Sequence, residues 1–80
     1  MTAENVSNEQ LLKDINITEQ ELGAYDSLYK AFRILAHLPE NVGSSMERVY
    51  SFEYEKYLNL ANECNRFFNK LNDIKSERGL

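Results

Sequence analysis

The chain has 80 residues, a net charge of −4, one cysteine and one histidine. A chain of this length buries only about 60–65% of the surface that it exposes when unfolded, so we expect one domain that gains stability from oligomerisation. The single cysteine excludes an internal disulfide, and one Cys and one His far apart in sequence do not form a metal site. The negative charge argues against nucleic-acid or membrane binding through the general field of the protein.

The first segment with a pattern follows residues 1–6, which we expect to fray. A short helix is predicted from Ser7, because Gln10 can complete a capping box and the apolar Leu11, Leu12 and Ile15 follow at helical spacing. Residues 16–18 are expected to end this helix. Thr18 and Glu21 form a second capping box, which predicts a new helix start there.

A second helix is predicted over residues 19–37. Its apolar positions keep helical spacing: Leu22, Tyr25, Leu28, Tyr29, Phe32, Leu35 and Ala36. Pro39 disfavours helical geometry at the residue before it, so the helix should end near His37. Gly23 either allows close approach of a neighbouring helix or is a tolerated surface glycine.

The longest predicted helix covers residues 44–77, because no Pro or Gly interrupts them and Ser44 with Glu47 reads as a capping box. One apolar line contains Met46, Tyr50, Tyr57, Leu60, Cys64, Phe67, Leu71 and Ile74. A second line contains Tyr54, Leu58, Ala61 and Phe68. A polar face of asparagines lies opposite, and residues 78–80 are expected to fray.

These elements predict an all-α fold, an antiparallel helical hairpin with a short N-terminal helix, in a single domain over residues 1–80. The short connection from Pro39 to Gly43 makes its flanking helices antiparallel neighbours. Their lengths, about 30 and 48 Å at 1.5 Å per residue, leave the end of the long helix overhanging. The overhang should be covered by the N-terminal helix, by a second copy in a helical-bundle oligomer, or by both. The predicted self-association residues are Phe67, Phe68, Leu71 and Ile74.

A candidate ligand site lies on the first arm, where Lys30, Arg33 and His37 share one helical face beside Tyr29. Cations can meet a phosphate while tyrosine rings stack on a base, so this face suits a small anionic ligand. The alternative is a solvated face on which Asp26 and Lys30 pair at a spacing of four. The full candidate set is Tyr25, Tyr29, Lys30, Arg33, His37, Arg48 and Tyr54.

Aromatic residues crowd the start of the long helix, at Tyr50, Phe52, Tyr54 and Tyr57, and at least one of them should be exposed or in an interface. Glu53 is either a buried carboxylate that needs a partner or a sign that the apolar line has ended. Cys64 is expected to act as a small buried hydrophobe. His37 has no nucleophile or orienting acid near it in sequence, so we predict no enzyme, no cofactor and no metal.

The function predicted from these features is binding of a protein partner by a small soluble cytoplasmic protein, as an inhibitor, antitoxin-like or adaptor module. The alternative is an oligomer that sequesters a small anionic ligand such as a nucleotide or a cyclic-nucleotide signal. In size and layout the chain resembles the small helical-hairpin proteins of phages and mobile elements. The resemblance implies sequestration of host factors or cyclic nucleotides and assigns no residue.

Overall fold

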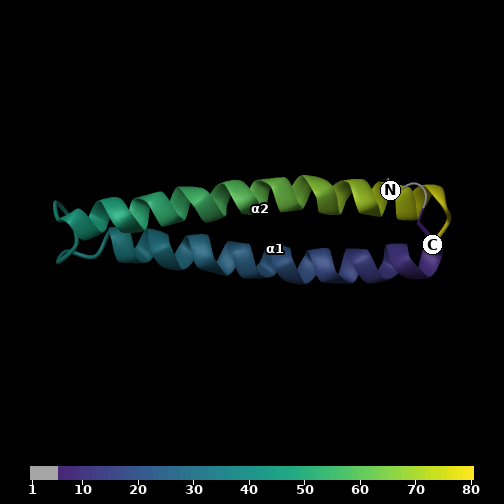
Figure 1. Ribbon diagram of the computed structural model, residues 1–80, viewed down its shortest axis with the longest axis horizontal. Helices are drawn as coiled ribbons and strands as arrows, with labels where there is room; N and C mark the ends of the chain where they lie inside the picture. Colours follow the sequence, from purple (N-terminus) through teal and green to yellow (C-terminus); the bar gives the residue numbers. More distant parts are fainter. Residues whose placement is uncertain (1–5) are drawn as a thin grey trace.

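The structure is a computed structural model that describes residues 6–80, so the predicted fraying of residues 1–5 lies outside the described residues. Val6, also expected to fray, packs against the core. Two long helices, α1 (Asn8–Ala36) and α2 (Ser45–Glu77), run side by side in opposite directions (Figure 1). The predicted all-α helical hairpin is confirmed. The hairpin is elongated, because its radius of gyration is 17.0 Å, whereas a compact chain of this length has about 12 Å.

Helix α1 begins where the capping residues predict. The Ser7 hydroxyl accepts a hydrogen bond of 3.1 Å from the backbone N–H of Gln10. However, α1 continues through residues 16–18 to Ala36, so the predicted short N-terminal helix does not exist as a separate element. Helices of 29 and 33 residues are about 43 and 50 Å long. The predicted overhang of the long helix is therefore wrong.

Thr18 explains why α1 is not broken. Its hydroxyl donates to the carbonyl oxygen of Asp14, one turn earlier, at 2.7 Å, and its side chain is buried. A threonine whose hydroxyl is satisfied in this way has no need to cap a helix. Residues 8–22 contain neither Pro nor Gly, so no residue there breaks a helix. Packing against α2 therefore stabilises the helical conformation at residues 16–18.

The connection of residues 37–44 closes both helix ends with local hydrogen bonds. His37 is the C-cap of α1, so the helix ends where Pro39 predicted, and the Asn41 side-chain amide donates to the carbonyl oxygen of Leu35 at 2.7 Å. Gly43 adopts a positive φ of 81°, a conformation that favours glycine.

The reciprocal capping box predicted for α2 does not form. Ser44 is the N-cap, but its hydroxyl donates to the carbonyl oxygen of Asn41 at 2.6 Å. Glu47 instead accepts from the backbone N–H of Gly43. The tight turn brings the Asn41 carbonyl within reach of the Ser44 hydroxyl, so this hydroxyl does not cap α2.

The core of the hairpin is aliphatic where the start of α1 meets the end of α2. Leu11, Leu71 and Ile74 are buried there, with Val6 and Ile15 packed against them. Arg78, expected to fray, donates through Nη1 to the carbonyl oxygen of Val6 at 2.8 Å and to the Asn8 side chain at 3.0 Å. This end of the hairpin is therefore closed by aliphatic packing and by hydrogen bonds.

The half near the connection is held by aromatic rings from both helices. Tyr25 stacks on Tyr57 with ring centroids 6.3 Å apart, and Tyr29 meets Tyr54 edge-on at 6.0 Å. Phe32 lies 5.8 Å from Tyr57 in a parallel stack. These six-ångström contacts lie in the preferred range for aromatic pairs, but the rings are only half-buried. The core is therefore thin along this half.

Candidate functional site

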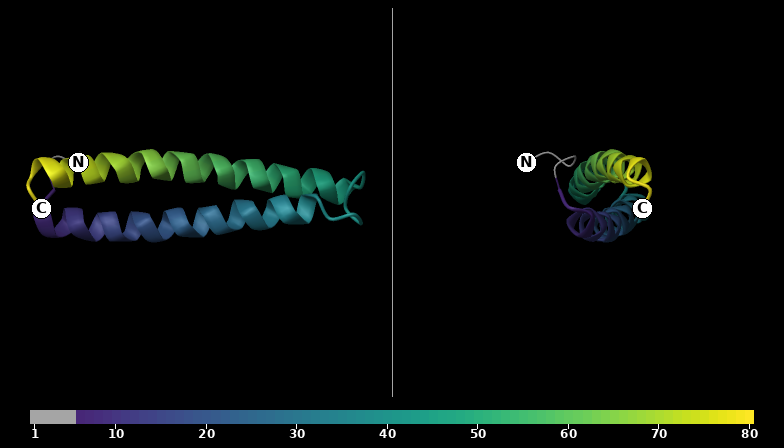
Figure 2. Two further views of the ribbon diagram at one scale, coloured as in Figure 1. Left: turned by 180° about the vertical axis from the view of Figure 1, so that it is seen from behind. Right: turned by 90° about the vertical axis from the view of Figure 1, so that its right-hand side faces the viewer.

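The seam between the helices divides the surface of the hairpin into two sides. Viewed along the axis, α1 and α2 form one pair, and among residues 6–80 no third element covers either side (Figure 2). The α1 seam runs through Leu11, Ile15, Thr18, Leu22, Tyr25, Tyr29, Phe32 and Ala36. The α2 seam runs through Tyr50, Tyr54, Tyr57, Ala61, Cys64, Phe68 and Leu71. Because these residues recur at steps of three and four, residues beside the seam recur at steps of seven along one side or the other.

On one side, the positions beside the seam are mostly apolar. We call it the apolar side, and it contains Ile17, Leu28 and Leu35 from α1 and Met46, Val49, Leu60 and Phe67 from α2. Phe67 and Val49 are each 50% exposed, and Leu28 is 38% exposed. Several large apolar side chains are therefore in water along one side of a hairpin that buries few such residues.

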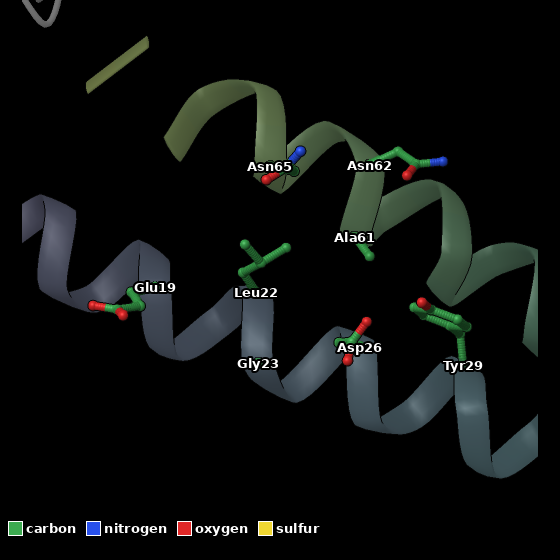
Figure 3. A pocket seen from close by; sticks show the side chains of 8 residues that line it. All are labelled: Glu19, Leu22, Gly23, Asp26, Tyr29, Ala61, Asn62 and Asn65. Atoms are coloured by element: carbon green, nitrogen blue, oxygen red, sulfur yellow. The ribbon is translucent and has the colours of Figure 1, made fainter. Parts of the chain in front are cut away.

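The opposite side, which we call the polar side, contains an open hollow of about 460 Å³ (Figure 3). Its lining residues are Glu19, Leu22, Gly23, Asp26, Tyr29, Ala61, Asn62 and Asn65. Leu22 and Tyr29 point from α1 toward α2, and Ala61 points back toward α1 (Figure 3). The small Gly23 and Ala61 leave this space between the helices. A Cβ at Gly23 would meet nothing within 4 Å, so this glycine is not a point of close helix approach.

The polar groups of the hollow are two carboxylates, two amides and the Tyr29 hydroxyl. Lys30 Nζ lies 2.7 Å from an Asp26 carboxylate oxygen, at the spacing of four that the sequence suggested. The hydrogen bonds from Lys30 and Tyr29 lower the pKa of Asp26. The bond to Asp26 in turn raises the pKa of Tyr29 and that of Lys30. Glu19 adds a second carboxylate, so the hollow has little to offer an anion.

The structure does not gather the predicted ligand residues around this hollow. Among them only Tyr29 lines it. Tyr25 and Tyr54 are paired with other rings in the seam. Helical spacing places Lys30, Arg33, His37 and Arg48 on the polar side near the connection, and all four are exposed. His37 Nδ1 lies 2.7 Å from the carbonyl oxygen of Arg33, the position of a helix cap. The anionic-ligand site stays a prediction.

The four predicted self-association residues occupy different environments. Leu71 and Ile74 are buried against the start of α1. Phe68 is half-buried in the seam, whereas Phe67 is half-exposed on the apolar side. Phe67 is thus the only one of the four that is free to contact another molecule without opening the hairpin.

The other residues singled out by the sequence have structural roles. Phe52 is 68% exposed, which confirms that not all aromatics of α2 face α1. Glu53 is half-buried at the edge of the apolar side, in line with Met46 and Leu60, so it does not sit in the seam. The Cys64 thiol lies 3.6 Å from the carbonyl oxygen of Thr18. Burial, with a contribution from the nearby Glu21, raises the pKa of this thiol and keeps it protonated.

Sequence reasoning missed the apolar side because it assigned apolar residues to lines on α2 alone. A signal was present, since Met46, Leu60, Phe67 and Ile74 recur at multiples of seven, but only the position of α1 shows which line is the seam.

No protein-family model matches the chain, and neither a curated protein nor a solved structure is detectably similar to it. In the part of the chain that the structure describes, no group of three or more His, Cys, Asp or Glu side chains could hold a metal ion. Neither helix among these residues is long and apolar enough to cross a membrane.

Proposed function

We propose that this chain is a helical interaction module that acts by binding protein through its apolar side, in the manner of an inhibitor, an antitoxin-like protein or an adaptor. The observation that carries the proposal is the difference between the two sides. The half-exposed Leu28, Val49 and Phe67 lie together on one side. The other side carries Asp26, Asn62 and Asn65 around the hollow, with the exposed Leu12 near its end. Apolar strips of this kind mark interaction surfaces on small soluble proteins.

The thin core supports the same proposal. Among the described residues, only five apolar side chains are buried: Leu11, Ala36, Ala61, Leu71 and Ile74. Covering a further side chain the size of Leu or Phe is worth about 1.5–3 kcal/mol. A partner on the apolar side would therefore stabilise the hairpin as well as bind it. The proposal places the protein in the cytoplasm, where thiols such as that of Cys64 stay reduced.

Sequestering of a small anionic ligand is the weaker alternative. Two carboxylates line the hollow on the polar side, and none of the basic residues near the connection lines it. A second subunit would have to complete such a site.

The proposal is tested by site-specific photo-cross-linking in the native cells of this protein. A benzophenone amino acid at position 67 is compared with the same amino acid at position 62, because Phe67 and Asn62 are both exposed on α2 but face opposite sides. We expect the probe at position 67 to capture protein and the probe at position 62 to capture little. Equal capture from both positions, or none from position 67, would contradict the proposal.

A further inference from the structure

We propose that the partner of the apolar side is a second copy of this chain, related by a two-fold axis near Leu60, with the two α2 helices antiparallel. This inference rests on the proposed function, since it names the occupant of the same surface. The resulting assembly is a four-helix bundle in which each hairpin covers the exposed apolar strip of the other. The hairpin is 52 Å long and 17 Å wide, which leaves room for the roughly 800 Å² that each partner contributes to a standard interface.

Two symmetric arrangements can bring two apolar sides together. If the two-fold axis crosses the hairpins, α2 packs antiparallel to the partner's α2 and α1 to the partner's α1. If the axis runs along the hairpins, α2 packs against α1 of the partner subunit. The charged residues beside the apolar strip decide between them, because like charges face each other in one arrangement and opposite charges in the other.

The charges on α2 favour the first arrangement. Along the apolar side they alternate as Glu53, Lys56, Glu63 and Lys70, so reversing the direction of the helix exchanges the signs. With the axis near Leu60, Lys56 lies opposite the partner's Glu63, and Glu53 lies within one turn of the partner's Lys70. Two copies of each pair form by symmetry. Lys56 already leans toward the seam, with Nζ 5.3 Å from the centre of the Tyr57 ring, so its ammonium lies beside this interface.

The apolar residues fit the same register. Leu60 meets the partner's Leu60 on the axis. On α1, Leu28 lies opposite the partner's Ile17. The small Ala24 lies between this pair and the two-fold axis. In the second arrangement Glu21 lies beside the partner's Glu63, and Glu53 and Lys56 lie against the partner's Leu28, which leaves these charges without opposite charges.

The first arrangement also contains two unfavourable contacts, since Glu53 lies opposite the partner's Phe67 and Glu21 of both subunits lies close to the axis on α1. Removing the Glu21 charge should therefore strengthen the dimer. A Glu21→Gln variant is expected to lower the dimer dissociation constant, whereas a Glu19→Gln variant on the polar side leaves it unchanged. An unchanged or raised dissociation constant for Glu21→Gln would contradict the placement of the axis.

Disulfide trapping tests the arrangement directly. In a Cys64→Ala background, Leu60→Cys should oxidise to a covalent dimer under air, because the two thiols meet at the axis. Asn62→Cys, two residues away on the polar side, is the matched control and should stay monomeric. A Leu60→Cys variant that stays monomeric while a mixture of Leu60→Cys and Ala24→Cys forms the heterodimer would overturn the first arrangement in favour of the second.

Charge exchange tests the pairing independently of any disulfide. Lys56→Glu and Glu63→Lys should each weaken the dimer at least fivefold in sedimentation equilibrium, with helicity unchanged by circular dichroism. The double variant restores the opposite pairs and should recover most of the loss. Additive weakening in the double variant would overturn the register.

These outcomes separate this inference from the proposed function. If the probe at position 67 captures a different protein while Leu60→Cys remains monomeric in all combinations, the apolar side is an interaction surface but its partner is not this chain. If position 67 captures no protein at all, both proposals are wrong. Capture of a product with twice the 9.3 kDa mass of the chain supports both.

Discussion

Beside the seam, one side of the hairpin carries Leu28, Leu60 and Phe67, whereas the other carries Asp26, Asn62 and Asn65 at similar levels along the helices. Both sides flank the same seam, so the packing of α1 on α2 does not require them to differ. On the polar side the hollow is open to solvent, so water can hydrate its carboxylate and amide groups. The apolar side leaves side chains half-exposed that a partner could cover. The difference between the sides thus points to function, whereas the seam accounts for the fold.

The largest expected effect separates the seam from the apolar side. Leu71, in the seam, is 1% exposed, whereas Phe67, one turn before it on the apolar side, is 50% exposed. Leu71→Ala should lower the free energy of unfolding by about 2–5 kcal/mol, because it leaves a cavity in the aliphatic core. Phe67→Ala should cost clearly less in urea denaturation at low protein concentration, where a dimer does not contribute. Equal losses would mean that Phe67 belongs to the core.

The second-largest expected effect tests whether α1 is one continuous helix through residues 16–18. Glu19 is exposed in the interior of α1, so Glu19→Pro should cost about 3 kcal/mol through a lost hydrogen bond and a clash with the preceding turn. If a new helix began at Thr18, Pro at position 19 would occupy the first helical position, where it is tolerated. Glu19→Ala is the control. Similar denaturation midpoints for the Pro and Ala variants would contradict a continuous α1.

A charge placed on each side should affect association differently. Phe67→Asp removes a ring that is worth about 1.5–3 kcal/mol when covered, so the dimer dissociation constant should rise at least about tenfold. Asn62→Asp introduces the same negative charge on the polar side of the same helix and should leave association unchanged. Sedimentation equilibrium of the two variants in one buffer makes the comparison. An equal rise of the dimer dissociation constant in both variants would mean that the added negative charge weakens association wherever it is placed.

A smaller effect concerns the polar side alone. Gly23 lies in α1 beside the hollow, and a Cβ there meets nothing within 4 Å. Gly23→Ala should therefore raise the free energy of unfolding by about 1 kcal/mol through helix propensity, with no change in association. Thermal and urea denaturation check this increase. A loss of stability would show that a partner or a helix approaches this position closely.

The smallest effect is a pH dependence at Asp26. Its pKa is lowered from 3.8 by the hydrogen bonds from Lys30 and Tyr29. A lowered folded-state pKa contributes stability above pH 3.8 that is lost as the pH falls through the folded-state value. Thermal melts of the wild type and Asp26→Asn should differ slightly at neutral pH and converge below pH 3.8. Because Asp26 is solvent-exposed, the difference should be the smallest of this set. A difference in melting temperature that persists below pH 3.8 would show that it does not come from the Asp26 carboxylate.

The sequence predicted the elements of the fold better than their extent. The predicted helix over residues 44–77 is within one residue of α2, since neither Pro nor Gly interrupts it and Ser44 is its N-cap. The break at residues 16–18 was wrong because Thr18 has two local uses for its hydroxyl. It can accept from a backbone N–H as a cap or donate to the carbonyl one turn earlier, and tertiary packing selects the second.

The two sides could be predicted only in part. Helical spacing placed Phe67 and Phe68 about 100° apart, but it did not show which of them faces α1. That choice depends on the pairing of both helices, which places Cys64 opposite Thr18 and Tyr57 opposite Tyr25. The hollow depends on Gly23 and Ala61 lying across from each other, 38 residues apart in sequence. Such pairings follow from register, which the sequence does not specify locally.

If a second copy of the chain covers the apolar side, the wild-type protein should dimerise, and sedimentation equilibrium from micromolar to millimolar concentration measures this. We expect a mass that rises with concentration from 9.3 kDa to twice that value and stops there, because the apolar sides close on each other. A mass of 9.3 kDa at every concentration would contradict it.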